Sequence, residues 1–557
     1  MKLSFPVRIY FVALILRLIP ILLTSGLGIG LDDMFQYDML ARSISSGNGF
    51  RWYAQDDLKL LAPYVDFDLA TANGYDPEHG LYTSFRAPLY PAFLAIVYFF
   101  SGEGFSRFLA ARLVQVIFLG APLAPLTYFV ARYFFTAAHL KNVSLSDSEG
   151  SLIPKVRDSH LHDLLSKSRA AQVSVAENAP SERHSIFEIS NTKDNERTAK
   201  VSAWVVACYP MLLVYPLGLG TENPFFILLL SSFYFLLKSI QEPSKQNFIF
   251  SGIFLALTAL TRSVILPFAG LAILYLIFLP RLRKSVGNLS GLGESKQTSE
   301  VFPIKALLIG VAFAIVIAPW IIRNSLLHNK PTGIETSMGY NLYLGYHPDG
   351  NGSFVFGPSL DLLTIMDDAE RDEVGTSQAV EFIKEQPERF IPLAINRLGY
   401  FFGLEKRVLM YFYANDIIGF IPKPLLLTIA AILLLPFVFV SISASLGLSL
   451  LKWKPQTILL FLLFAFYLLP HIFILSEDRF HLALIPYLAI LAAHFWSVGF
   501  GAISRRWNES NMGKWMVTFA ILGVFLLSLN WGFELSRDAD KIAALLGPDG
   551  NKSYFPY

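Results

Sequence analysis

Continuous apolar runs are the feature that most constrains what this chain can fold into. Runs of roughly 17 to 25 apolar residues recur along the sequence, and each can cross a hydrocarbon core of about 30 Å as a helix. A transmembrane β-barrel would instead need strands in which polar and apolar residues alternate. Because 54% of the residues are hydrophobic and only 16% are charged, the sequence predicts an all-α polytopic membrane protein.

The apolar windows predict about eleven transmembrane helices. They lie near residues 9–25, 113–131, 201–217, 224–240, 248–261, 264–280, 303–322, 424–451, 456–475, 482–500 and 515–532. Loops rich in Lys and Arg remain on the cytoplasmic side of a membrane. That rule predicts a multi-pass protein of the cytoplasmic (inner) membrane with its N-terminus inside, because the inner connections then hold Arg132, Lys238, Lys245, 281–284, Lys452, Lys454, Arg505 and Arg506.

The spans divide the chain into regions of different character. These are 1–135, with the first two spans and an outer loop; 136–200; the helices of 201–322; the second outer loop 323–423; the helices of 424–532; and the outer tail 533–557. Region 136–200 is polar and almost without aromatic residues, so it predicts a disordered cytoplasmic insert. The outer segments 26–112 and 323–423 mix aromatic, proline and acidic residues, and ordered loops of that length are usually functional.

Charge and cysteine content exclude some classes of function. The net charge is +2, which gives no sign of a nucleic-acid partner. The one cysteine, Cys208, cannot form an internal disulfide. The sequence also contains no Walker loop, GxSxG, HExxH or paired CxxC motif. We therefore expect the partners to be membrane lipids and the molecules that reach the outer loops.

An acidic pair follows the first span. In LDDMFQYDMLARSISSGNGF, residues 31–50, apolar residues recur at helical spacing and predict a short interfacial helix. Asp32 and Asp33 stand at its start, where acids commonly cap a helix. Alternatively, one of them is a general base, because partial desolvation at the membrane edge would raise its pKa. Both interpretations fit the spacing.

Several cations and one acid are expected near the same membrane face. Arg86 precedes the apolar helix of FRAPLYPAFLAIVYFFSG, where it could reach lipid headgroups or stabilise a departing phosphate. Glu222, Arg262, Arg479 and His481 lie at predicted outer ends of spans, where each serves as an anchor or ion-pair partner or belongs to a site. Arg17, near the middle of the first span, is expected to have a structural partner.

A tyrosine-rich turn in the second outer loop is a further candidate. GYNLYLGYHPDGNGSF contains Tyr346 and His347 beside turn residues, and it could cover a sugar site. His347 and Asp349 are too few to indicate a metal centre, so no metal ligands are assigned. The sequence indicates no particular cofactor; a divalent ion is left open, although no ligand cluster in the sequence supports one.

The order of these strings resembles the GT-C membrane glycosyltransferases. The strings are the acidic pair 32–33, YDMLARSISSGNGF, RAPLYP, TEN, LTR, APWIIRN and RFHLALIP. They are most similar to the bacterial branch related to protein O-mannosyltransferases and aminoarabinose (lipid A) transferases. The resemblance spans most of the chain outside 136–200 and the C-terminal tail.

The resemblance implies an inverting transfer of a sugar from a polyprenyl-phosphate donor to a glycan, lipid or protein hydroxyl outside the cytoplasm. It implies that Asp32 is the base and that Asp33 takes the place of the family's glutamate. Arg86 and Arg479 would bind the donor phosphate; Phe480 stands where the family commonly has tyrosine.

Other classes share parts of this pattern. A multi-pass transporter or lipid flippase would be expected to show repeated halves and sites near the middle of the membrane, and the sequence shows no such repeat. A polymerase or ligase for lipid-linked glycans would share both the topology and the donor class.

Overall fold

The computed structural model describes residues 3–67, 74–135, 180–287, 296–407, 409 and 421–547. Apart from two short strands, its secondary structure is helical, which confirms the all-α polytopic class. In the described part of the chain, nine segments are long and apolar enough to cross a membrane. They are built from α1 (Phe5–Leu23), α5 (Ser106–Gln115) with η2 (Val116–Gly120) and α6 (Leu123–Phe135), α10 (Glu222–Gln241), η6 (Ser263–Ile265) with α12 (Leu266–Gly287), α13 (Lys296–His328), α19 (Lys423–Ser449), α20 (Pro455–Phe473), η9 (Phe480–Leu484) with α21 (Ile485–Val498), and α23 (Asn511–Arg537).

The predicted count of eleven spans is not confirmed, because two of the expected spans differ from single long helices. The first, 201–217, consists of the end of α8 (Pro180–Cys208) followed by α9 (Pro210–Val214) and η5 (Tyr215–Leu217), with a bend of 54°. The second, 248–261, is α11 (Lys245–Ala259), which has 15 residues. Counting the bent pair as one span gives ten among the described residues.

Arg17 explains how the bend in the membrane region is tolerated. Pro210 has no N–H to give to the Val206 carbonyl, and no water is present in a hydrocarbon core to replace it. The fully buried Arg17 guanidinium donates to the Val206 carbonyl at 3.0 Å and the Ala207 carbonyl at 3.2 Å. The structural partner expected for Arg17 is therefore the end of α8.

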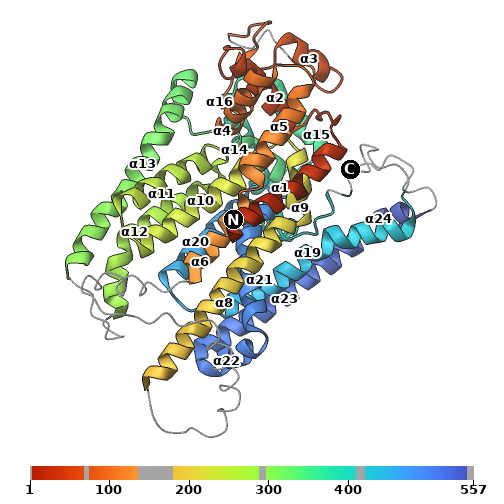
Figure 1. Ribbon diagram of the computed structural model, residues 1–557. Helices are drawn as coiled ribbons and strands as arrows, with labels where there is room; N and C mark the ends of the chain where they lie inside the picture. Colours follow the sequence, from red (N-terminus) through yellow and green to blue (C-terminus); the bar gives the residue numbers. More distant parts are fainter. Residues whose placement is uncertain are drawn as a thin grey trace.

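Close helix contacts build the bundle (Figure 1). Helix α8 packs on α6 and α21, α19 packs on α21 and α23, and α11 packs on α10 and α13. Small residues allow close approach: a Cβ on Gly252 would overlap the Ile309 carbonyl, and one on Gly447 would overlap the Leu491 carbonyl. Large apolar side chains such as Phe519 and Phe525 remain exposed, as expected of faces that contact lipid.

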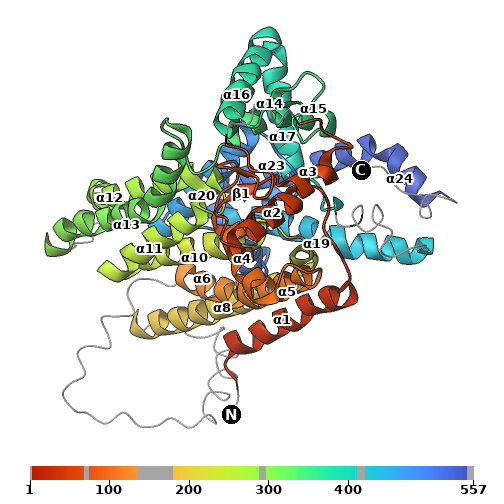
Figure 2. The same cartoon turned by 90° about the horizontal axis from the view of Figure 1, so that it is seen from above.

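A polar cap, formed by the described residues of 26–105 and 329–407, lies at one end of the bundle (Figures 1 and 2). Its first part holds α2 (Asp33–Ser45), β1 (Arg51–Trp52), α3 (Gln55–Leu61), β2 (Leu81–Tyr82) and α4 (Leu89–Ser101). The strands pair antiparallel, and α2 packs on α4. Its second part holds α14 (Met338–Tyr346), α15 (Phe356–Asp361), η7 (Leu362–Thr364), α16 (Asp368–Glu385), η8 (Pro387–Arg389) and α17 (Phe390–Phe401).

Two of the predicted regions, 136–200 and 533–557, are only partly covered by the described residues. Of the predicted insert 136–200, residues 136–179 lie outside the described residues, and the rest belongs to α8, which begins at Pro180. Helix α8 therefore extends about 20 residues before the span predicted at 201–217. The tail from 533 holds the end of α23 and α24 (Ala539–Leu546), and the opposite end of the bundle holds α22 (Gly501–Glu509).

Replacing Arg17 by Met should destabilise the protein, because it leaves the carbonyls of Val206 and Ala207 without donors. An unsatisfied buried polar group costs about 1–3 kcal/mol. Thermal unfolding of the detergent-purified protein measures the effect, with Arg8→Met as a control because Arg8 is exposed on the same helix. Equal melting temperatures for the two variants would show that the carbonyls at the bend do not depend on Arg17.

Candidate functional site

The acidic pair stands at the start of α2. Asp32 is the N-cap residue, and its carboxylate accepts a hydrogen bond from the Met34 backbone N–H at 2.9 Å. The capping interpretation is therefore confirmed for Asp32. Asp33 begins the helix, and its carboxylate contacts two cations, Arg86 and Arg479.

Arg86 lies across from α2, just before α4. Its guanidinium forms an ion pair and a hydrogen bond with Asp33 and donates through Nε to the Gln36 side chain at 2.8 Å. It also lies over the rings of Tyr37 and Phe85, 5.4 and 5.1 Å from their centroids. These contacts point Arg86 toward α2.

Arg479, in the turn before η9, connects three carboxylates. Its guanidinium lies 2.7 Å from Glu477, 3.4 Å from Asp33 and 3.7 Å from Glu222. Glu222, at the start of α10, also pairs with Arg262 at 3.0 Å, and Glu477 pairs with Arg407 at 2.8 Å. We refer to these groups together as the ion cluster: Asp33, Arg86, Glu222, Arg262, Arg407, Glu477 and Arg479.

The ion cluster shifts the acidity of the two aspartates in opposite directions. Burial by itself would raise the pKa of Asp33, but the charges of Arg86, Arg479 and Arg262 outweigh burial and lower its pKa to about 2. The Asp32 side chain reaches solvent, yet the protein crowded around it and the negative charge of Asp33 raise its pKa above the ordinary value. Asp33 is thus held ionised, while Asp32 is the more basic carboxylate.

Three expected site residues have their contacts elsewhere. His481 is fully buried, hydrogen-bonded through Nε2 to Glu405 at 3.0 Å and through Nδ1 to the Phe401 carbonyl at 2.7 Å. Tyr346 donates to the Phe473 carbonyl at 2.9 Å. His347 Nδ1 accepts from the Asp349 backbone N–H, closing a turn. Within the described residues, none of the three contacts the ion cluster.

Glu477 and Arg407 are members of the ion cluster that the sequence did not single out. The sequence could have indicated Glu477, because it directly precedes Asp478 and Arg479 in SEDRFHLALIPY. It could not have indicated Arg407, since nothing in the spacing of segment 402–407 indicates contact with a residue 70 positions away. Residues this distant in sequence meet only when the polar cap docks on the helix ends.

Two cations, Arg86 and Arg479, next to the more basic carboxylate of Asp32 are suited to bind an anionic ligand close to a base. Arg86 and Arg479 approach the same carboxylate from different elements, and the Asp33 side chain is 38% exposed. No group of three or more His, Cys, Asp or Glu side chains among the described residues could hold a metal ion.

One family model matches the chain, that of the dolichyl-phosphate-mannose-protein mannosyltransferases, over residues 184–322. The match includes Glu222 and Arg262 of the ion cluster and leaves Asp32, Asp33, Arg86 and Arg479 outside it. No curated protein matches the sequence. The family match and the bundle of apolar helices together fit a membrane glycosyltransferase of the GT-C type, similar to the mannosyltransferases.

Proposed function

We propose that this protein transfers a sugar from a polyprenyl-phosphate-linked donor to a hydroxyl group of an acceptor outside the cytoplasm. The observation that carries this proposal is the Asp33 carboxylate between Arg86 and Arg479, next to the more basic Asp32. The site lies where the polar cap meets the helix ends, so a prenyl chain can remain in lipid while its sugar phosphate reaches the loops.

Two arginines that share one anion are suited to hold the donor phosphate. Arginine binds phosphate through charge-assisted hydrogen bonds. The Asp33 carboxylate contacts both Arg86 and Arg479, which shows that the two guanidiniums lie close enough to share one anion. When the bond from the anomeric carbon to the phosphate oxygen breaks, negative charge develops on the phosphate, and the two guanidiniums stabilise it.

Asp32 is the better candidate for the base. A base at neutral pH works best when its pKa is raised toward that pH, and the pKa of Asp32 is raised while that of Asp33 is about 2. Asp32 takes the proton of the acceptor hydroxyl, whose oxygen attacks the anomeric carbon as the polyprenyl phosphate departs. Attack opposite the leaving group inverts the configuration at that carbon.

Replacing Asp32 by Asn should abolish most of the transfer, because Asn keeps the shape and the capping oxygen but cannot take a proton. Loss of a general base lowers the rate by about 10²–10⁴-fold. The rate is measured as transfer of labelled sugar from a panel of polyprenyl-phosphate donors in membranes. Asp33→Asn is assayed in parallel, and Asp56→Asn, at an exposed position, is the control.

The outcomes of this assay separate the roles. Collapse in Asp33→Asn with activity in Asp32→Asn would reverse the assignment of the base. Full activity in both variants would leave the acidic pair with capping and ion pairing alone. Transfer from no donor by the wild type would overturn the proposed function.

The pH dependence of transfer should also identify the base. The base must be ionised, so kcat/KM should fall as the pH falls through the raised pKa of Asp32, giving an acidic limb at a higher pH than an ordinary aspartate would give. Asp33→Asn removes a neighbouring negative charge, which should move this limb to lower pH. The limb should stay in place in Asp56→Asn, and an unmoved limb in Asp33→Asn would argue against Asp32 as the titrating group.

A transporter is the second candidate, because broken helices within the membrane are typical of transporter sites. The bend between α8 and α9 is such a break. However, the Arg17 guanidinium occupies the carbonyls of Val206 and Ala207 that would otherwise coordinate an ion there. The contacts of Arg17 therefore favour a structural role for the bend, and the glycosyltransferase remains the proposed function.

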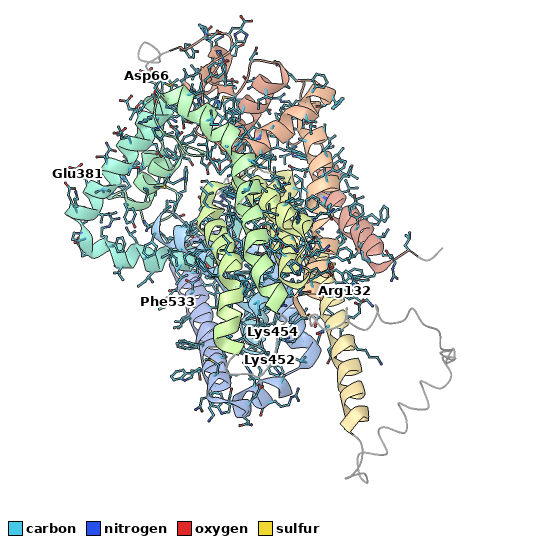
Figure 3. All side chains as sticks on the ribbon, turned by 90° about the vertical axis from the view of Figure 1, so that its left-hand side faces the viewer. Asp66, Arg132, Glu381, Lys452, Lys454 and Phe533 are labelled. Carbon is cyan, nitrogen blue, oxygen red and sulfur yellow. The ribbon has the colours of Figure 1, made fainter. Side chains whose placement is uncertain are left out.

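We also propose that the polar cap faces outward. Lys452, Lys454 and Arg132 lie toward the end of the molecule opposite Asp66 and Glu381 (Figure 3), and basic loops remain in the cytoplasm.

The orientation can be tested with single cysteines in a Cys208→Ser background. In intact cells, a membrane-impermeant maleimide should label Asp66→Cys and should label Lys454→Cys only after permeabilisation, because the two positions face opposite sides of the membrane. Both positions are exposed in the protein, so access depends on the side alone. The opposite pattern of labelling would contradict the proposed topology.

A further inference from the structure

The segment that leads into Arg86 is held by the second part of the polar cap. We call residues 83–85 the strap; they follow β2 and directly precede Arg86. Thr83 donates its hydroxyl to Asp368 Oδ2 at 2.5 Å, and the Ser84 backbone N–H donates to the same oxygen at 2.8 Å. One carboxylate oxygen thus fixes a side chain and a backbone group of consecutive residues.

Asp368 is itself held firmly. It is the first residue of α16 and is 2% exposed. Its other oxygen accepts from Arg371 at 3.1 Å, and Arg371, fully buried, donates to the carbonyls of Leu362 and Ile365. A buried carboxylate with charge-assisted hydrogen bonds of this kind has a defined position, and it therefore also fixes the position of the groups that donate to it.

Further contacts hold the strap from its other sides. The Thr83 carbonyl accepts from Arg323 at 2.5 Å, and the Ser84 carbonyl accepts from the Thr336 backbone N–H at 3.0 Å. Phe85 is 1% exposed, and its ring packs on Trp52 and Tyr340, at centroid distances of 5.3 and 5.5 Å. The strap therefore has little freedom, and the bonds to Asp368 fix it on the side of α16.

We infer that Asp368 is a positioning residue for the donor site: by fixing the strap, it sets where the Arg86 guanidinium meets the donor phosphate. This inference rests on the proposed function. Arg86 is the next residue after the strap, so a shift of the strap moves its Cα directly. The two other groups at the anion position, Asp33 and Arg479, lie on elements to which Asp368 makes no hydrogen bond or ion pair among the described residues.

The inference assigns a function to the second part of the polar cap, which is to hold the strap in place. Residues 83–85 and 368 are far apart in the sequence, and they belong to the two outer segments that the sequence analysis treated separately. The anion position is complete only when α16 is docked on the strap.

Asp368→Asn tests this role, with Asp372→Asn as the matched control. Asp372 lies one turn further along α16 and accepts from the Gly339 backbone N–H at 2.6 Å, so its replacement loosens the second segment without touching the strap. Asp368→Asn should raise the KM for the donor, because the Arg86 guanidinium would no longer be fixed where it meets the phosphate. Misplacement by about 1 Å can lower the rate by up to about a hundredfold, so kcat/KM for the donor should also fall. The KM for the acceptor should be nearly unchanged, and Asp372→Asn should leave the donor KM at the wild-type value.

Hydrogen exchange supplies a readout that does not depend on activity. The Ser84 amide should exchange faster in Asp368→Asn than in the wild type or Asp372→Asn, because its acceptor is weakened. Thr83→Val removes the Thr83 hydroxyl, with its bond to Asp368 and the bond that it accepts from the Phe85 backbone N–H, but keeps the bond from the Ser84 N–H to Asp368. It should therefore give a smaller rise in donor KM. This variant keeps the test open if Asp368→Asn does not fold.

The outcomes distinguish the inference from the proposed function. Faster exchange at Ser84 with an unchanged donor KM in an active enzyme would overturn the positioning role. An equal rise of donor KM in Asp368→Asn and Asp372→Asn would show a general structural effect and would also overturn it. A wild type that uses no polyprenyl-phosphate donor would instead overturn the proposed function, and the inference would fall with it.

Discussion

The need to satisfy every backbone polar group without water shapes this protein. In a hydrocarbon core a free carbonyl or N–H is costly, so the chain crosses it as helices. The bend between α8 and α9 departs from that rule, and Arg17 compensates for it by donating to the carbonyls at the break. The charged residue inside a span, Arg17, thus has a structural role as a donor to backbone carbonyls. The charged residues of the ion cluster lie instead at the ends of the helices.

At those ends, arginines that are partly exposed form ion pairs with carboxylates. Glu222 and Glu477 are largely buried and face arginines that are partly exposed. Such an arrangement keeps guanidiniums in place before a ligand arrives, so less ordering is needed when it binds. Asp33 differs from the other carboxylates in being more exposed, and it is the one that lies between Arg86 and Arg479. Preorganised charges of this kind are what a departing phosphate requires.

The polar cap is two segments joined by buried polar bonds. The contacts of Asp368 with Thr83 and Ser84 join α16 to the strap, and the packing of Phe85 against Tyr340 adds an apolar contact beside them. Buried polar groups specify one arrangement, because a shifted register would leave them unpaired. The geometry around Arg86 therefore depends on residues nearly 300 positions further along the chain.

The sequence by itself determined the helical membrane class, most of the spans and the helix after the first span. It also singled out Asp33, Arg86, Glu222, Arg262 and Arg479, which the structure brings together in the ion cluster. Apolar run length, capping and the cost of charges near a membrane are local properties, so they can be read along the chain. Only the tertiary structure decided that His481, Tyr346 and His347 lie apart from the ion cluster and that Glu477 and Arg407 belong to it. It also decided that Asp368 holds the strap and that the chain bends between α8 and α9. These outcomes depend on which helix ends and loops meet, and contact between distant residues leaves no periodic pattern in a single sequence.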